Sequence, residues 1–230
     1  VFDGFCGSGM TGIAAQIAGR RAILCDLSPA ATFIASCFNH PIDEAEFTSI
    51  ANRIIEVLQK ECGWMYETTH ADGRKGEINF TVWSDVHGCP YCLTEQLLWN
   101  IAVEPRDKIV HDSFRCGHCG AGLDKDSMPK VFDSSGQAKT VPVLIDYSTS
   151  QGRYEKAPDE GDLRLLQLIE RTEIPYWYPT DKMMFIGERW GDMYVPLHHE
   201  GMSRVDQFYT KRNLWALSAM FHQIQVEAKG

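Results

Sequence analysis

Asp3-Gly-Phe-Cys-Gly-Ser-Gly-Met-Thr-Gly12 is the stretch of this 230-residue chain that decides its fold. Its glycines at 7, 9 and 12 fit the pattern Gly-x-Gly-x-x-Gly, in which a tight turn brings the backbone close to a ligand. Asp26 follows Gly7 by 19 residues, close to the spacing at which an acidic side chain binds the ribose of an adenosine-containing ligand. The stretch therefore predicts a nucleotide-type cofactor site near the start of the chain.

The flanking residues predict a compact strand–helix–strand–helix unit. Val1-Phe2 ends a first strand, and residues 10–18 form a small-residue helix that Gly19 terminates. Residues 21–25 form a second strand, and Ser28-Pro29 starts the next helix with a serine N-cap and a proline in the first turn. Such a unit predicts an α/β fold with a parallel sheet.

The charge beside the turn distinguishes two classes of cofactor. A dinucleotide would place a pyrophosphate at the turn, where the carboxylate of Asp3 would repel it. S-adenosylmethionine has no phosphate and carries a sulfonium and an ammonium group, which a carboxylate attracts. Both cofactors contain adenosine, and both would use Asp26. Asp3 therefore favours S-adenosylmethionine.

The stretch 3–12 resembles the Asp-Pro-Phe-Cys-Gly-Ser-Gly cofactor motif of amino-group DNA methyltransferases, which modify adenine N6 or cytosine N4. Asp26-Leu27-Ser28-Pro29 resembles the acidic loop of the same family. Gly4 stands where the family has proline, and Met10 stands where it has threonine. The resemblance implies that the cofactor is bound by Asp3, Phe5, Cys6, Gly7, Ser8, Gly9, Asp26 and Leu27.

Two Cys-x-x-Cys pairs predict a metal site. Cys89-Pro-Tyr-Cys92 and Cys116-Gly-His-Cys119 each offer two thiolates from one tight turn, which Gly117 and Gly120 suit. Four thiolates close a tetrahedral shell around Zn²⁺ and leave no open position, so we expect a structural zinc ion. His118 lies between two ligands and is not expected to be one itself.

The segment around this site carries more acidic than basic side chains between residues 71 and 130. An excess of carboxylates does not favour phosphate binding. We therefore expect this cysteine-bearing segment, a zinc ribbon, to serve as a rigid arm that contacts the target or docks a partner subunit.

The other four cysteines are expected to be packing residues. Cys25 and Cys37 occupy core-facing positions, Cys62 ends a helix, and Cys6 packs inside the glycine turn. A nucleophilic role for Cys6 is not expected, because the chain lacks the Pro-Cys dipeptide of enzymes that methylate cytosine C5.

The tail over 206–218 resembles the Phe-Thr-x-Arg-Asn-Leu segment of zinc-containing adenine-specific DNA methylases. In that family an Asp/Asn-Pro-Pro-aromatic loop follows this helix and accepts hydrogen bonds from the amine of a flipped base. The chain contains no Pro-Pro, so we expect no catalytic residue within it and a catalytic loop downstream of Gly230. Lys211 and Arg212 are the expected DNA phosphate contacts, and the aromatic residues over 176–194 are expected to be core.

These patterns predict three segments: 1–70 as the cofactor-binding half of the core, 71–140 as a zinc-ribbon insertion, and 141–230 as a return to the core. Periodicity predicts strands over 78–83 and 141–147 and helices over 43–62, 159–173 and from 210. In the helix over 43–62, the apolar side chains expected to face the core are Phe47, Ile50, Ala51, Ile54 and Leu58. In the helix from 210 they are Leu214, Leu217, Phe221 and Ile224. The expected fold is α/β, a partial Rossmann-like methyltransferase core with an inserted four-cysteine zinc ribbon.

Composition restricts the class of protein and its expected location. With 44% hydrophobic residues the chain has enough apolar mass for a core, and its net charge of −9 argues against a protein that coats nucleic acid through bulk charge. No apolar run approaches the roughly 20 residues of a membrane helix, and no secretory signal precedes the first residue, so we expect a cytoplasmic protein with no membrane partner.

The predicted function is methylation of an exocyclic base amine in DNA by S-adenosylmethionine, with adenine N6 favoured. One alternative is a dinucleotide-dependent oxidoreductase. The other is a non-catalytic zinc-ribbon adaptor on a degenerate methyltransferase core. The choice between adenine and cytosine, and between DNA and RNA, stays open at this point.

Overall fold

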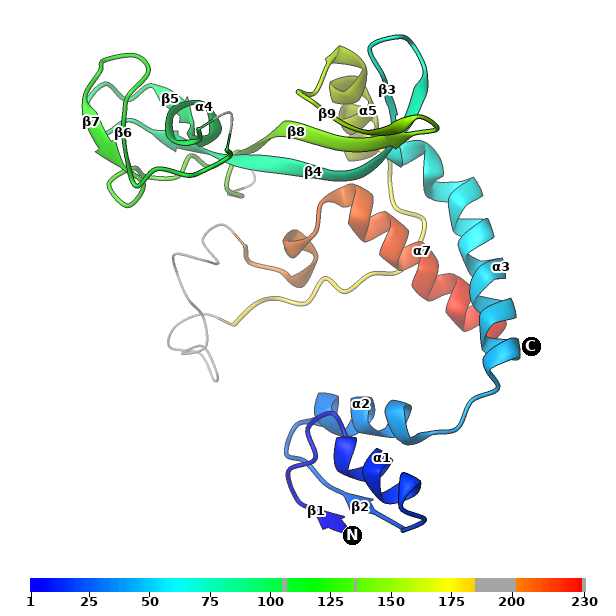
Figure 1. Ribbon diagram of the computed structural model, residues 1–230. Coiled ribbons are helices and arrows are strands. Elements are labelled where there is room, and N and C mark those ends of the chain that lie inside the picture. Colours follow the sequence, from blue (N-terminus) through cyan, green and yellow to red (C-terminus); the bar gives the residue numbers. More distant parts are fainter. Residues whose placement is uncertain (105–106, 135, 185–201, 229–230) are drawn as a thin grey trace. The chain divides into compact units, whose positions relative to one another are not determined.

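The computed structural model describes residues 1–104, 107–134, 136–184 and 202–228. The chain forms two compact units, Val1–Arg53 and Ile54–Gly230 (Figure 1). The division falls inside helix α3 (Glu44–Cys62) and not at residues 70 and 140, where the sequence placed its boundaries. Strand β4 (Lys75–Gly88) pairs with strand β8 (Thr140–Thr149), so the expected insertion and the expected return share one sheet.

The first unit contains the predicted strand–helix–strand–helix order. Strands β1 (Phe2–Asp3) and β2 (Ile23–Leu24) are parallel, and they are connected by helix α1 (Met10–Ile17). Helix α2 (Pro29–Asn39) follows, and the hydroxyl of Ser28 accepts a hydrogen bond from the amide of Ala31 as its N-cap. The parallel pairing predicted from this stretch is confirmed.

Small residues hold helices α1 and α2 together. Gly9 has a φ of 81° and lies against Ala35, and a Cβ on Gly12 would collide with Asn39 and Leu24. The Asn39 amide donates to the carbonyl oxygen of Gly9 at 3.0 Å. This close packing requires glycine at both positions.

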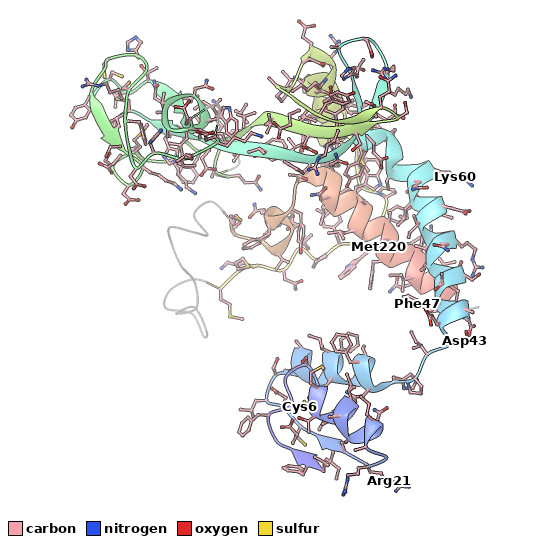
Figure 2. All side chains as sticks on the ribbon, in the orientation of Figure 1. Cys6, Arg21, Asp43, Phe47, Lys60 and Met220 are labelled. Atoms are coloured by element: carbon pink, nitrogen blue, oxygen red, sulfur yellow. The ribbon has the colours of Figure 1, made fainter. Side chains whose placement is uncertain are left out.

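Most of the large apolar side chains of the first unit are exposed. Cys6 is buried, as expected, but Cys25 and Cys37 are exposed, so their predicted core positions are wrong. In α3, Ile54 is buried and Ile50, Ala51 and Leu58 are half-buried, as predicted. Phe47, labelled in Figure 2, is 60% exposed, so this one member of the predicted core face is wrong. The α3 side chains that join a buried cluster, Leu58 and Cys62, lie at the other end of the helix.

The second unit is built on an antiparallel sheet of order β3-β4-β8-β9, with β3 at Glu67–Thr69 and β9 at Gly152–Lys156. Strand β4 has 14 residues and is longer than the predicted 78–83. Its end, Val86–Gly88, pairs with β5 (Glu95–Leu97), so one strand belongs to both the main sheet and the cysteine-bearing region (Figure 1). That region also contains α4 (Leu98–Ala102), β6 (Ser113–Arg115) and β7 (Gly122–Asp124).

Two helices complete the core of the second unit. Helix α5 (Glu160–Arg171) begins with a capping box between Asp159 and Asp162. Helix α7 (Lys211–Glu227) follows the 3-10 helix η3 (Val205–Phe208), and the hydroxyl of its N-cap Thr210 accepts from the amide of Asn213. The buried cluster between these helices, the end of α3 and the 3-10 helix η1 (Gly63–Tyr66) consists of Cys62, Met65, Ile169, Ile174, Leu214, Trp215 and Ala219.

The predicted apolar side of α7 is only partly correct. Leu214 is buried, but Leu217, Phe221 and Ile224 are 42–48% exposed. Trp215 and Ala219, one helical turn apart, are buried instead. The helix therefore packs through a face rotated from the predicted one.

The aromatic segment after α5 is also mixed. Tyr176 and Tyr178 pack against the core cluster, whereas Trp177 is 68% exposed. The part of the predicted aromatic core over 185–194 lies outside the described residues. Over the described ranges, no helix has the length and apolar character that crossing a membrane requires.

Candidate functional site

The four predicted metal ligands meet in the structure. The sulfur atoms of Cys89, Cys92, Cys116 and Cys119 all lie within 4.8 Å of one another. Sγ of Cys89 is 3.8 Å from Sγ of Cys119, and Sγ of Cys92 is 3.8 Å from Sγ of Cys116. Sulfur atoms bound tetrahedrally to zinc at about 2.3 Å would be separated by about 3.8 Å. The cluster can therefore hold a structural metal ion such as zinc, with no open position for substrate.

Two matching turns present these sulfur atoms. In each turn the residue after the second cysteine has a positive φ, 60° at Leu93 and 72° at Gly120. The amide of Leu93 donates to the carbonyl of Cys89, and the amide of Gly120 donates to the carbonyl of Cys116. Gly120 suits the turn as predicted. Leu93 adopts the same left-handed conformation without being glycine, which costs backbone strain.

Hydrogen bonds favour the thiolate form, which binds metal, at two of the four sulfur atoms. At Cys119, in contrast, burial and the bonds shared with the other three sulfur atoms raise the pKa to about 11. The amides of Cys119 and His118 lie 3.5 and 3.4 Å from Sγ of Cys116, and these bonds, chiefly that from Cys119, lower the pKa of that thiol. The hydroxyl of Thr94 lies 3.5 Å from Sγ of Cys92, and its hydrogen bond is the main cause that lowers the pKa of Cys92 to about 5. Sequence reasoning missed Thr94, because an isolated threonine two residues after a cysteine carries no recognisable signal.

A small apolar cluster surrounds the four cysteines. Cys89 and Cys116 are buried with Leu123 and Met128, and Ile101 and Phe114 pack against them. Gly117 donates its amide to Oε1 of Gln96 at 3.2 Å, which ties the second turn to β5. A core this small usually needs a covalent or metal cross-link for stability.

The second predicted site is the glycine turn of the first unit. The amide of Gly7 donates to Oδ2 of Asp26 at 3.0 Å, and the amide of Ser28 donates to Oδ1 at 2.9 Å. These bonds hold the pKa of Asp26 below its usual value, and the bond from Ser28 has the larger effect. The structure therefore places an ionised carboxylate at the end of β2, directly beside the turn.

The other expected cofactor residues line the same turn in different ways. Asp3 is half-buried at the end of β1 and accepts a hydrogen bond from the amide of Phe5 at 3.1 Å. Phe5 and Leu27 are 83% and 92% exposed, and Ser8 is exposed as well. No atom lies within 4 Å of a Cβ built on Gly7, so open space faces that glycine. Gly9, in contrast, is buried against α2 and serves packing.

The two expected DNA contacts lie elsewhere, at the start of α7, and neither is a free surface cation. Nζ of Lys211 donates to the backbone carbonyl of Glu170 at 2.6 Å. Arg212 is only 8% exposed. Lys211 therefore binds a carbonyl near the end of α5 and Arg212 is buried, and their role as DNA contacts stays a prediction.

No protein-family model matches this chain, and neither a curated protein nor a solved structure matches it. The likeness to amino-group DNA methyltransferases thus stays a prediction from the motifs at 3–12, 26–29 and 206–218.

Proposed function

We propose that this chain contributes the S-adenosylmethionine site of an enzyme that methylates an exocyclic base amine in DNA, adenine N6 in the first place. One observation carries the proposal: a backbone bond from Gly7 holds the carboxylate of Asp26 beside a glycine turn. The turn connects the first of two parallel strands to a helix. This arrangement suits an adenosine-containing ligand.

The charges around the turn support a cationic cofactor. Asp26 is ionised at neutral pH, and Asp3 lies at the end of the neighbouring strand β1. Each oxygen of Asp26 accepts one backbone bond and keeps a lone pair that a ribose hydroxyl can use. Two carboxylates near the turn would repel a pyrophosphate and attract a sulfonium or an ammonium group. This favours S-adenosylmethionine over a dinucleotide.

Methyl transfer from a sulfonium needs in-line positioning of the amine more than covalent help from the protein. We assign to this chain only the positioning of the cofactor, and not that of the amine. We assign no residue of this chain to the amine half, because the sequence contains no Asp/Asn-Pro-Pro-aromatic loop. The same absence favours the second candidate, a non-catalytic adaptor on a degenerate methyltransferase core.

We further propose zinc as the metal of the four-cysteine centre, since an all-thiolate tetrahedron suits that ion. The ion would hold together the turns that carry the ligands and the short elements β5, α4, β6 and β7. The resulting rigid arm would contact DNA or a partner subunit. We propose a cytoplasmic setting, where such thiols stay reduced.

Ultraviolet cross-linking with methyl-labelled S-adenosylmethionine tests the cofactor assignment. We expect label on the tryptic fragment that ends at Arg20 and contains the glycine turn. Asp26→Ala should lower the yield, and Asp72→Ala, in the second unit, should not. Label confined to the second unit would overturn the proposal.

A further inference from the structure

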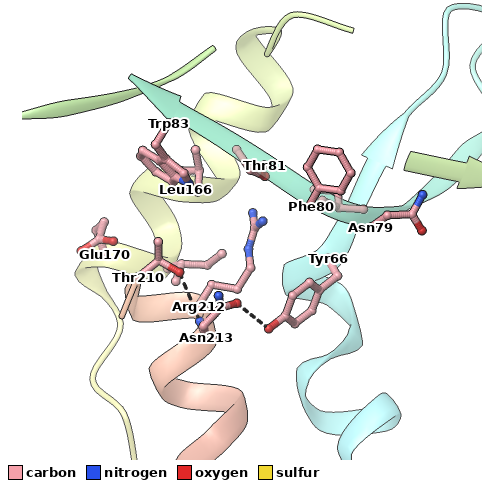
Figure 3. Close-up of a pocket in the computed structure, with 12 residues that line it drawn as sticks. Tyr66, Asn79, Phe80, Thr81, Trp83, Leu166, Glu170, Thr210, Arg212 and Asn213 are labelled. Carbon is pink, nitrogen blue, oxygen red and sulfur yellow. Dashed lines mark hydrogen bonds between the residues drawn. The ribbon is translucent and has the colours of Figure 1, made fainter. Parts of the chain in front are cut away.

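The second unit contains a cavity of about 230 Å³ that neither the metal centre nor the cofactor turn explains (Figure 3). Its walls come from η1, β4, α5 and the first turn of α7. Three aromatic side chains line it: Tyr66, Phe80 and Trp83. The cavity is therefore assembled from segments far apart in sequence within one compact unit.

Arg212 extends from α7 into this cavity, toward the strand that carries Thr81 (Figure 3). The residue is 8% exposed, and its buried Nε has no hydrogen-bond partner among the described residues. The guanidinium lies over the ring of Tyr66, 5.4 Å from its centroid. Burial lowers the pKa of Arg212, which shows how little solvent offsets this charge.

Asp162, the carboxylate that interacts electrostatically with Arg212, has other hydrogen-bond and ion-pair partners. Oδ1 of Asp162 accepts from the hydroxyl of Thr68 at 2.6 Å, and Oδ2 pairs with Nζ of Lys156 at 2.8 Å. Glu170 lines the cavity too, but it is an exposed residue. A buried guanidinium with no described ion pair is costly, so its retention calls for an explanation.

Two further polar residues, Thr81 and Asn213, line the same cavity. Oγ1 of Thr81 is buried and has no hydrogen-bond partner among the described residues. Oδ1 of Asn213 accepts from the hydroxyl of Tyr66 at 3.1 Å, which leaves the amide NH₂ of Asn213 as a donor. The first turn of α7 adds the positive end of a 17-residue helix. The cavity thus offers a cation and neutral donors, the chemical complement of an oxyanion.

We propose that this cavity binds a phosphate group, with Arg212 supplying the charge and Thr81 and Asn213 the neutral hydrogen bonds. The aromatic walls suit a phosphate that belongs to a nucleotide or to a nucleic-acid strand, because bases stack on aromatic rings. The inference rests on the proposed function only for its choice of nucleic acid as one source of the phosphate. It does not depend on the glycine turn.

Thermal unfolding in inorganic phosphate, against chloride at equal ionic strength, tests the site directly. A ligand that binds only the folded state raises the midpoint, so wild type should show a rise that grows with phosphate concentration. Arg212→Met should abolish that rise. Without phosphate, Arg212→Met should unfold at the same or a higher temperature than wild type, because it removes an unpaired buried charge. Arg164→Met, at an exposed arginine on α5 that pairs with Glu160, is the matched control and should keep the rise.

Two milder variants keep the test decisive if Arg212→Met folds poorly. Arg212→Lys keeps the charge but loses the planar fork, and it should weaken phosphate binding at least about tenfold. Thr81→Val removes the hydroxyl with little change of shape and should weaken binding several-fold. A phosphate-dependent rise that is equal in wild type, Arg212→Lys and Thr81→Val would overturn the proposal, as would the absence of any rise in wild type.

Parallel titrations with deoxyadenosine monophosphate and a single-stranded oligonucleotide identify the source of the phosphate. Arg212-dependent binding of the monophosphate alone assigns a free nucleotide. Arg212-dependent binding of the oligonucleotide assigns a DNA strand. S-adenosylhomocysteine binding, measured on the same variants, should stay at the wild-type level. If that binding persists while phosphate binding is absent, this inference fails and the proposed function stands. If phosphate binds but S-adenosylhomocysteine does not, the reverse holds.

Discussion

The amide of Gly7 donates a hydrogen bond to Oδ2 of Asp26 at 3.0 Å, across 19 residues of sequence. This bond connects the glycine turn after β1 to the end of β2, and a second bond from Ser28 holds the other carboxylate oxygen. Together the two bonds fix the position and the charge of the carboxylate beside the open face of the turn. The cofactor proposal depends on this relationship.

The first prediction concerns the protonation of Asp26. The folded pKa is lowered by the bonds from Ser28 and Gly7, so the carboxylate stabilises the turn at pH values above its unfolded pKa, about 3.9. That stabilisation is lost as the pH falls through the lower, folded pKa. In an NMR titration, the amide signals of Gly7 and Ser28 should therefore shift together below the usual aspartate range. Asp26→Asn should remove the shift, and a midpoint above 4 would contradict the assignment.

The second prediction concerns the metal centre. The purified protein should contain about one Zn²⁺ per chain, and Cys89→Ser or Cys116→Ser should lose it. Cys37→Ser, at an exposed cysteine outside the cluster, serves as the control and should keep the ion. Metal analysis that finds well under half an equivalent in folded wild-type protein would count against the site.

Removal of the ion should act locally first. The cysteine-bearing region has only a small apolar cluster of its own, whereas the main sheet and α5 belong to other buried clusters. After chelation, hydrogen exchange should rise over β5, α4, β6 and β7 before it rises in β8. Equal exchange in both regions would show that the metal does not stabilise this part selectively.

The third prediction tests the packing of the first unit. Gly12→Ala should destabilise it by about 1–3 kcal/mol, because the added methyl group collides with Asn39 and Leu24. Gly4→Ala is the matched control, since its Cβ would meet only Phe2 at an ordinary 3.5 Å. Equal denaturation midpoints for the two variants would disprove this account of helix packing.

The fourth prediction tests the core of the second unit. Ile169→Ala should cost about 2–5 kcal/mol, because Ile169 is 1% exposed and its truncation leaves a cavity. Leu168→Ala, on the same helix at 54% exposure, should cost much less. Urea denaturation followed by tryptophan fluorescence reports on this unit, because all six tryptophans of the chain lie within it. A larger loss at Leu168 than at Ile169 would reverse the assigned orientation of α5.

The start of the chain could be predicted closely because its signals are local. Ser28 is a preferred N-cap residue and Pro29 suits the first turn of a helix, and Gly19 has the positive φ that often follows the end of one. The metal ligands were equally clear, since paired cysteines constrain one another at short range. Burial was predicted less well. Cys25 and Phe47 have the residue type and spacing of core positions, but burial depends on which elements pack against them, and sequence periodicity does not record that.

Two features had no usable sequence signal. The full length of β4 was missed because its end pairs with β5 next to a glycine and a cysteine turn, which predicted a loop. Arg212 and Lys211 were both predicted as phosphate contacts from their charge. Their structural roles differ because the first points into a cavity and the second caps a carbonyl, and only tertiary structure separates the two.

The most direct test of the central claim is a calorimetric comparison of S-adenosylhomocysteine and NAD on the same preparation. We predict that S-adenosylhomocysteine binds and NAD does not. Asp26→Ala should weaken binding about tenfold or more, because it removes the carboxylate that accepts the ribose hydroxyls. Binding of S-adenosylmethionine itself, which carries the sulfonium charge, should also be weakened by Asp3→Asn. NAD binding more tightly than S-adenosylhomocysteine would contradict the account.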